Sequence, residues 1–231
     1  MKTTINPPEE AIRSAAELAA QMIGEKSGLT IAVTAGKDEL AVLAAALGMA
    51  AESGAPLGGL RVVAACELCG LPPEDGGLRG DVAAALSGLL ADGQIIAPDG
   101  DRPGDTDRMI AEAGGLDLAI LGLGENSAVA FNEPATQFDT HTHVQRLTGK
   151  TRAALAERFG GEDKVPERGV TLGFRELCAA RRIVVIALGE RMRDAAFRMI
   201  YGRDDSIYPA AFLQIPSDVS VFLDAGSAER L

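Results

Sequence analysis

The sequence has no tryptophan, and aromatic residues make up 4% of its 231 positions, so stacking surfaces for bases or sugar rings are scarce. Three cysteines in a chain this long do not form a disulfide framework. No apolar run approaches the ~20 residues of a membrane span. The first ten residues lack the basic and apolar segments of a secretory leader. We therefore expect a cytoplasmic protein with no membrane partner.

Positive charge is also in short supply. The chain carries 22 Lys and Arg against 33 Asp and Glu, a net charge of −11. So acidic a surface repels a phosphate backbone, so nucleic acid is not an expected partner. A small anion is still compatible, because backbone amides at a helix N-terminus bind phosphate whatever the distant field.

Strand and helix patterns alternate along the chain, which is 47% hydrophobic. Near-continuously apolar strands such as 116–123 are typical of a parallel sheet covered on both faces. We predict an α/β, Rossmann-like three-layer sandwich with a mainly parallel, doubly wound sheet. No linker divides it, so residues 1–231 are expected to form one domain. The expected strands are 29–33, 60–65, 116–123, 183–188 and 219–223, with a short extended piece at 170–172. Helices are expected at 7–23, 38–53, 82–90, 105–113, 174–180 and 190–201.

Glycine or polar residues follow four of these strands directly, at 34–38, 66–71, 122–134 and 189–193. In open α/β sheets, ligands bind beyond the carboxyl ends of the strands. We therefore expect these segments to converge on one pocket.

Segment 121–134 reads Leu-Gly-Leu-Gly-Glu-Asn-Ser-Ala-Val-Ala-Phe-Asn-Glu-Pro. It resembles the signature of the glucosamine-6-phosphate deaminase/isomerase superfamily, where Asp-Gly-His-Ile-Ala-Phe-Asn-Glu-Pro follows a glycine-rich turn. Segment 66–72 is similar to the family's Asp-Glu-Tyr-x-Gly-Leu-Pro, and 34–38 to its Thr-Gly-Gly-Ser/Thr-Pro phosphate loop. Weaker matches at 158–173 and 213–214 extend the resemblance over nearly the whole chain. It implies phosphosugar chemistry in amino sugar metabolism, no cofactor, and an assembly of identical subunits.

The resemblance also supplies candidate site residues. Those expected to be catalytic are Glu133, Glu67, Cys66 and Asn126. Those expected to bind substrate or phosphate are Thr34, Ala35, Gly36, Lys37, Gly124, Arg158, Arg191 and Arg193.

Four positions depart from the family. Its proton-transferring Asp falls on Cys66, the Asp of Asp-Gly-His on Asn126, the ring-opening His on Ala128 and the phosphate-binding Lys on Met192. Since an amide and a methyl group cannot relay protons, the usual deaminase mechanism is not expected. Glu133 either lines the pocket or pairs with a nearby cation or turn.

Three functions remain open: an isomerase- or deaminase-type enzyme with altered acid–base groups, a non-catalytic sugar-phosphate sensor, and a hydrolase like 6-phosphogluconolactonase, which shares the architecture. A structural partner of an active homologue is a weaker alternative. The Cys66-x-x-Cys69 pair lacks a second ligand cluster, so we interpret it as packing residues. His141 and His143 are interpreted as surface histidines on a strand, and no metal site is predicted.

Overall fold

The computed structural model describes residues 1–71, 75, 77–203 and 206–231. Its strands are β1 (Lys2–Ile5), β2 (Thr30–Val33), β3 (Arg61–Ala64), β4 (Cys66–Leu68), β5 (Ile95–Ile96), β6 (Leu118–Leu121), β7 (His143–Arg146), β8 (Arg168–Thr171), β9 (Arg182–Ala187) and β10 (Val219–Leu223). The α-helices are α1 (Pro8–Glu25), α2 (Lys37–Glu52), α3 (Gly77–Ala85), α4 (Pro103–Glu112), α5 (Gly149–Phe159), α6 (Phe174–Cys178) and α7 (Arg193–Tyr201). Short 3₁₀ turns are η2 (Asp92–Gln94), η3 (Glu162–Lys164), η4 (Glu190–Met192) and η5 (Pro209–Gln214).

The central sheet has seven strands in the order β1-β10-β9-β6-β2-β3-β5, and each neighbouring pair is parallel. From β2 the chain first adds β3 and β5 on one side. It then returns to place β6, β9 and β10 on the other side. The strand order therefore reverses between β2 and β6, where open α/β sheets form their ligand crevice. The predicted fold class is confirmed.

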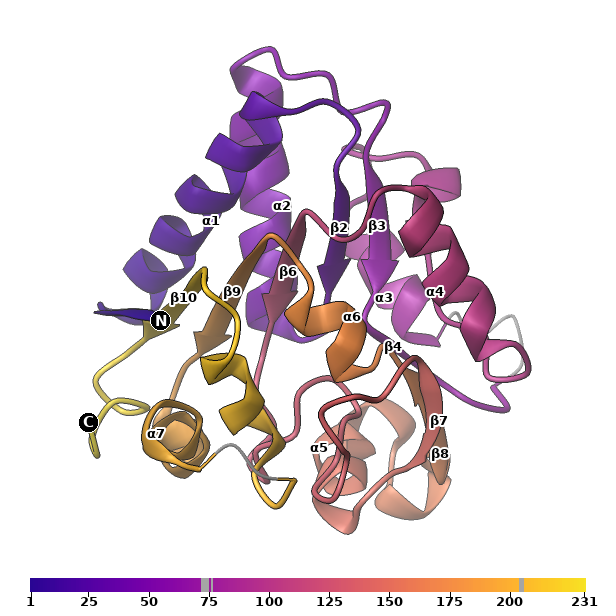
Figure 1. The fold of residues 1–231 in the computed structure, drawn as a ribbon, viewed down its shortest axis with the longest axis vertical. Helices are drawn as coiled ribbons and strands as arrows, with labels where there is room; N and C mark the ends of the chain where they lie inside the picture. The colour runs from indigo at the N-terminus through magenta and orange to yellow at the C-terminus, as the bar shows by residue number, and fades with distance from the viewer. Residues whose placement is uncertain (72–74, 76, 204–205) are drawn as a thin grey trace.

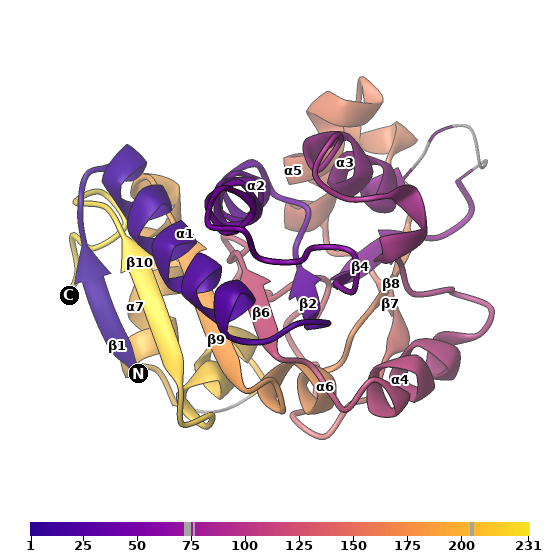
Figure 2. The ribbon, with the colours of Figure 1, turned by 90° about the horizontal axis from the view of Figure 1, so that it is seen from above.

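Helices cover both faces of this sheet (Figures 1 and 2). α1, α2 and α3 lie on one face, and α4, α6 and α7 on the other. A small antiparallel sheet, β4-β8-β7, and α5 lie past the carboxyl ends of the central strands, at the lower right of Figure 1. This addition provides a wall for the crevice.

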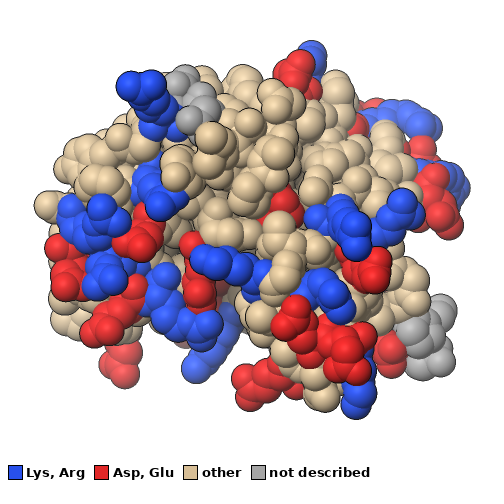
Figure 3. Space-filling view, turned by 90° about the horizontal axis from the view of Figure 1, so that it is seen from below, with Lys and Arg blue, Asp and Glu red and all other residues tan. Residues whose placement is uncertain are grey.

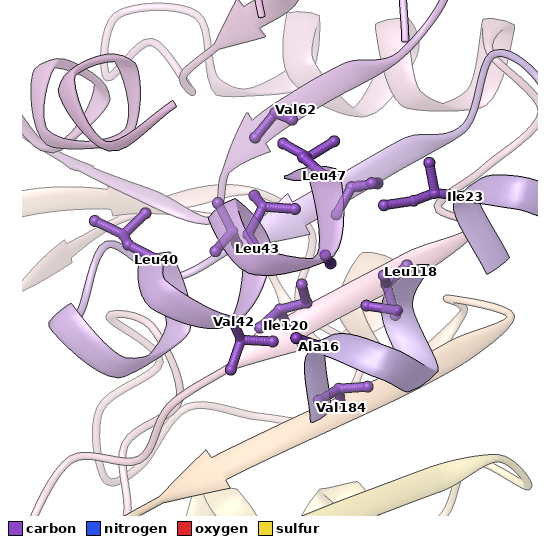
Figure 4. Packing of buried hydrophobic residues seen from close by; sticks show 14 of the residues in the cluster. Ala16, Ile23, Leu40, Val42, Leu43, Leu47, Val62, Leu118, Ile120 and Val184 are labelled. Carbon is purple, nitrogen blue, oxygen red and sulfur yellow. The ribbon is translucent and has the colours of Figure 1, made fainter. Parts of the chain in front are cut away.

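Strand alternation builds two separate hydrophobic layers. Ile31 and Val33 belong to the cluster under α1 and α2, whereas Ala32 belongs to the cluster on the opposite face. This follows from the two-residue period of a strand. Figure 4 shows Leu43 and Leu47 of α2 packed over β3 and β6 in the first cluster. Both faces of the central strands are buried, which is why their sequences are continuously apolar.

Several elements differ from the sequence-based prediction, and the strands β4 and β5 were not predicted. The helix expected at 82–90 is α3, which begins earlier, at Gly77, in what was taken as a loop. The short edge strand β1 was not predicted. Helix α5 was also missed; it has no fully buried residue and so no strong apolar period. Pro72 of the segment 66–72 lies outside the described residues.

Among the described residues, no helix combines the length and the apolar character that crossing a bilayer requires.

Leu47 tests the first hydrophobic layer because its side chain is fully buried. Leu47→Ala should lower the free energy of unfolding by about 2–5 kcal/mol, since it leaves a cavity that the packed sheet cannot fill. Urea denaturation measures this value. Ile215→Ala is the control, because Ile215 is 50% exposed and should change stability by less than about 1 kcal/mol. Equal losses in the two variants would contradict this description of the core.

Candidate functional site

A cavity of ≈ 230 Å³ lies where β2 and β6 end. It is smaller than the ~300–1,000 Å³ pockets of drug-sized ligands, so it suits a small metabolite. Three of the four predicted strand exits contribute to it, and the fourth, 189–193, does not. The described lining residues are Thr34, Ala35, Gly36, Glu39, Cys66, Leu78, Gly122, Leu123, Gly124, Glu125, Asn126, Ala128, Ala130, Phe131, Lys150, Thr151, Ala154 and Leu155.

Glu39 occupies the floor of this cavity. Its Oε1 accepts a hydrogen bond from Thr34 Oγ1 at 2.9 Å, and Thr34 Oγ1 in turn accepts one from the Gly122 amide at 2.8 Å. A Cβ on Gly122 would lie 1.7 Å from Glu39 Oε1, and one on Gly36 would lie 2.4 Å from Oε2. A side chain at either position would therefore force the Glu39 carboxyl group out of its observed place.

Burial raises the pKa of Glu39 from its ordinary value to about 7, and the charge of Asp38 adds to the rise. The hydrogen bonds from its own amide and from Thr34 oppose it only in part. Glu39 thus exchanges its proton near neutral pH, a property that general acid–base groups need. Glu39 is the third residue of α2, so its carboxyl group lies near the N-terminus of its own helix.

Glu133 is fully buried behind the cavity wall. Its carboxylate accepts hydrogen bonds from Asn126 Nδ2 at 2.6 Å, from the Thr148 amide at 3.1 Å and from Thr148 Oγ1 at 3.2 Å. Thr148 is also the N-cap of α5. Glu133 therefore ties the 122–134 loop to α5, and Asn126, which lines the cavity, is held by it.

The 122–134 loop is held in an unusual backbone conformation. The backbone φ angles of Ser127 and Ala130 are 66° and 53°. Residues other than Gly and Asn seldom adopt this left-handed region. Asn132 stabilises this loop conformation, because its Nδ2 donates hydrogen bonds to Val129 O at 3.0 Å and to Leu172 O at 2.8 Å. Such strained turns persist where the surrounding contacts fix them, often at functional sites.

Cys66 lines the cavity, but its thiol is held in the protonated form. Burial raises the pKa of its thiol, and the charges of Glu67 and Glu39 raise it further. The thiolate that nucleophilic or base catalysis needs is absent near neutral pH. All three cysteines are free.

Glu67 points elsewhere. Its carboxylate accepts hydrogen bonds from the amides of Leu78 and Arg79, both at 2.8 Å, and so caps the N-terminus of α3. It is not among the described cavity residues. This placement gives no support to the catalytic role expected for Glu67.

The predicted phosphate-binding residues divide into two groups. Thr34, Ala35, Gly36 and Gly124 line the cavity, whereas Lys37, Arg158, Arg191 and Arg193 are not among its described lining residues.

The three arginines each bind a carboxylate: Arg158 binds Asp81, Arg191 binds Glu125 and Arg193 binds Glu229. In Figure 3, which views the carboxyl-end side, Lys and Arg are interspersed with Asp and Glu around a largely uncharged centre. The expected arginine cluster for an anion is thus not assembled at the cavity.

Two charged residues that line the cavity, Glu39 and Lys150, were not named from the sequence. The place of Glu39 three residues after Gly36, at a strand exit, was a usable signal. Lys150 lies in the first turn of α5, a helix that was not predicted. Within the described lining it is the single Lys or Arg.

No family model matches the chain. Glucosamine-6-phosphate deaminase of Halalkalibacterium halodurans is 35% identical over 123 residues, which are 53% of this chain and 50% of the relative. The chain thus spans about half the length of the first curated relatives it matches. Glucosamine-6-phosphate deaminase of Bacillus velezensis is 29% identical over 230 residues, 95% of each chain.

Two solved structures share the fold. A monomeric glucosamine-6-phosphate deaminase superposes with a TM-score of 0.92 at 24% identity, covering 99% of each chain. The 6-phosphogluconolactonase of Trypanosoma brucei superposes with a TM-score of 0.78 at 17% identity, covering 100% of this chain and 98% of its own.

The buried carboxyl group makes stability depend on pH. The folded chain holds the Glu39 proton more tightly than the unfolded chain does, so the free energy of unfolding falls as pH rises from 4.5 to about 7. Glu39→Gln removes this loss and should stabilise the protein by on the order of 3 kcal/mol at about pH 8, with little effect near pH 4. Urea unfolding at both pH values measures it.

The matched control is Glu52→Gln, which removes a carboxylate at the exposed end of the same helix. It should leave the pH dependence unchanged. A Glu39→Gln variant that is less stable than the parent at about pH 8 would contradict the assigned ionisation.

Proposed function

Because the chain belongs to the glucosamine-6-phosphate deaminase/isomerase superfamily, with 6-phosphogluconolactonase as a relative, we propose that it binds a small phosphosugar in the cavity and transfers a proton on it through Glu39. The reaction we propose is an aldose–ketose isomerisation without deamination. The observation that carries it is a buried carboxyl group on the cavity floor with a pKa of about 7.

Glu39 is suited to replace the missing family acid. The resemblance puts the proton-transferring Asp at Cys66, and Glu39 and Cys66 line the same cavity and interact electrostatically. Moving a proton between adjacent carbons needs one base whose pKa lies near the working pH. Glu39 therefore supplies from α2 the function that β4 no longer supplies.

Deamination is disfavoured by the opposite wall. Ala128 has no proton to give at the position of the ring-opening His, and the Asn126 amide is engaged with Glu133 and Thr148. Neither group assists ring opening or departure of an amine. The proposed substrate is thus an open-chain or readily opened sugar without an amino group to release.

The phosphate has a better site at α5 than at α2. The first turn of α5 contains Lys150 and Thr151, both lining the cavity, and carries no acidic residue. The first turn of α2 contains Asp38 and Glu39. Since helix N-terminal amides and a lysine attract anions, we place the phosphate at the α5 end and the reacting carbons at the α2 end.

A non-catalytic sensor is the second candidate. The hydrogen-bonded network of Glu133, Asn126 and Thr148 favours this candidate. These hydrogen bonds hold in fixed positions the residues that the resemblance places at the family's acid–base groups. A lactonase reaction is a third alternative, in which Glu39 would activate water. All three share the cavity and differ only in turnover.

Turnover separates these candidates. Hexose 6-phosphates incubated with the protein in D₂O should gain deuterium at C1 or C2 under isomerisation, as followed by NMR. Glu39→Gln should reduce this exchange by about 10²–10⁴-fold, since it removes the general base. Glu67→Gln should leave it unchanged.

A protein that binds the sugar phosphate but shows no deuterium exchange, no lactone hydrolysis and no ammonia release would favour the sensor over the enzyme. Hydrolysis of 6-phosphogluconolactone alone would replace isomerisation by the lactonase reaction. Exchange that depends on Glu67 rather than Glu39 would overturn the assigned base.

Lys150 tests where the phosphate lies. Lys150→Gln should weaken the binding of a hexose 6-phosphate at least about tenfold, since charge-assisted hydrogen bonds contribute about 1.5–3 kcal/mol. The unphosphorylated hexose should be affected much less, as measured by calorimetry. Lys37→Gln, in the first turn of α2, is the matched control. Greater weakening by Lys37→Gln than by Lys150→Gln would move the phosphate back to the predicted loop at Gly36.

A further inference from the structure

Asp107, His141 and Glu176 form a cluster apart from the cavity. Their potential ligand atoms all lie within 4.8 Å of one another. Asp107 comes from α4, His141 from the segment before β7, and Glu176 from α6. His141 Nδ1 is 2.7 Å from Glu176 Oε1 and 3.6 Å from Asp107 Oδ2. Three segments distant in sequence thus bring one imidazole and two carboxylates together.

The carboxyl group of Glu176 is incompletely satisfied. Its side chain is 8% exposed. One oxygen, Oε1, faces His141, and the other, Oε2, is buried with no hydrogen-bond partner among the described residues. A buried acceptor with no donor is costly. A cation bound beside Oε2 would satisfy this acceptor.

Asp107 is already oriented toward the cluster. Thr142 holds it, because its amide donates to Oδ2 at 3.3 Å and its hydroxyl donates to Oδ1. Supporting hydrogen bonds of this kind orient the ligands of metal sites. His141 Nδ1 lies near both carboxylates. A cation placed among these three groups would contact all of them.

We propose that Asp107, His141 and Glu176 bind one divalent transition-metal ion of the Zn²⁺ type, linking α4, the segment before β7 and α6. Zinc bonds of about 2.0–2.2 Å place tetrahedral ligand atoms roughly 3.3 Å apart. That separation lies between the 2.7 Å and 3.6 Å observed here. All three ligand atoms lie within 4.8 Å of one another, so binding the ion would require side-chain shifts but no movement of the chain segments.

One imidazole with two carboxylates suits zinc or manganese better than calcium or magnesium, which prefer oxygen ligands only. Three protein ligands would leave one position for water. The sequence predicted no metal site, because the His141-x-His143 pair alone offers too few ligands. The structure starts β7 at His143 and directs the His141 ring to acids that lie more than thirty residues away in the chain.

Calorimetry with ZnCl₂ on the full chain, freed of tags and treated with chelator, tests the proposal. One ion should bind per chain. The melting temperature should rise by roughly 5–10 °C when free Zn²⁺ reaches about 100 times its dissociation constant. The Co²⁺ form should lack thiolate charge-transfer absorption, because no cysteine is a ligand.

Variants locate the ion. His141→Ala should weaken Zn²⁺ binding by more than about 100-fold, and Glu176→Gln should weaken it similarly, since losing even a supporting group costs about 10–100-fold. The His141→Ala substitution should change the stability of the fold little, because the His141 side chain is 56% exposed. His143→Ala is the matched control and should bind as the parent does. Absence of saturable binding, binding that survives His141→Ala, or thiolate bands in the Co²⁺ form would each overturn the proposal.

Discussion

A carboxyl group buried where the strand order reverses constrains the rest of the site. Removing Glu39 from water is costly, so the group holds its proton to near neutral pH and relies on Thr34 for its hydrogen bond. While Glu39 stays in this position, a side chain at position 36 or 122 would clash with its carboxyl group. Burial chiefly disfavours a thiolate at Cys66, and the charges of Glu67 and Glu39 raise the pKa of that thiol further. One buried carboxyl group thus affects both the packing and the charge of the cavity.

The opposite wall serves as a scaffold. The Glu133 carboxylate joins the 122–134 loop to the N-cap of α5 through two residues, Asn126 and Thr148. Because Lys150 follows that cap, its position depends on the same hydrogen bonds. A carboxylate that resembles a catalytic acid in the sequence therefore contributes here by holding the loop and α5 in a fixed relation.

Sequence reasoning predicted the layered fold because the central strands, such as Leu118–Leu121, are apolar on both faces and end in glycine. It also placed Thr34, Gly36, Gly124 and Asn126 at one pocket, since parallel strands end on the same side.

It could not assign side-chain direction. Glu67 turned out to cap α3, and three arginines are paired with acids far along the chain, contacts that no local pattern encodes. Glu39 was overlooked for the same reason, since its helix position alone gives no measure of burial.

The amide at Asn126 has a consequence for which residues this position tolerates. Its Nδ2 lies 2.6 Å from Glu133 Oε2, a contact that an aspartate could make only by sharing a proton. An aspartate at position 126 would therefore place a second carboxylate against the buried Glu133. A single exchange there is unfavourable unless neighbouring residues change with it, so positions 126, 133 and 148 are coupled in sequence.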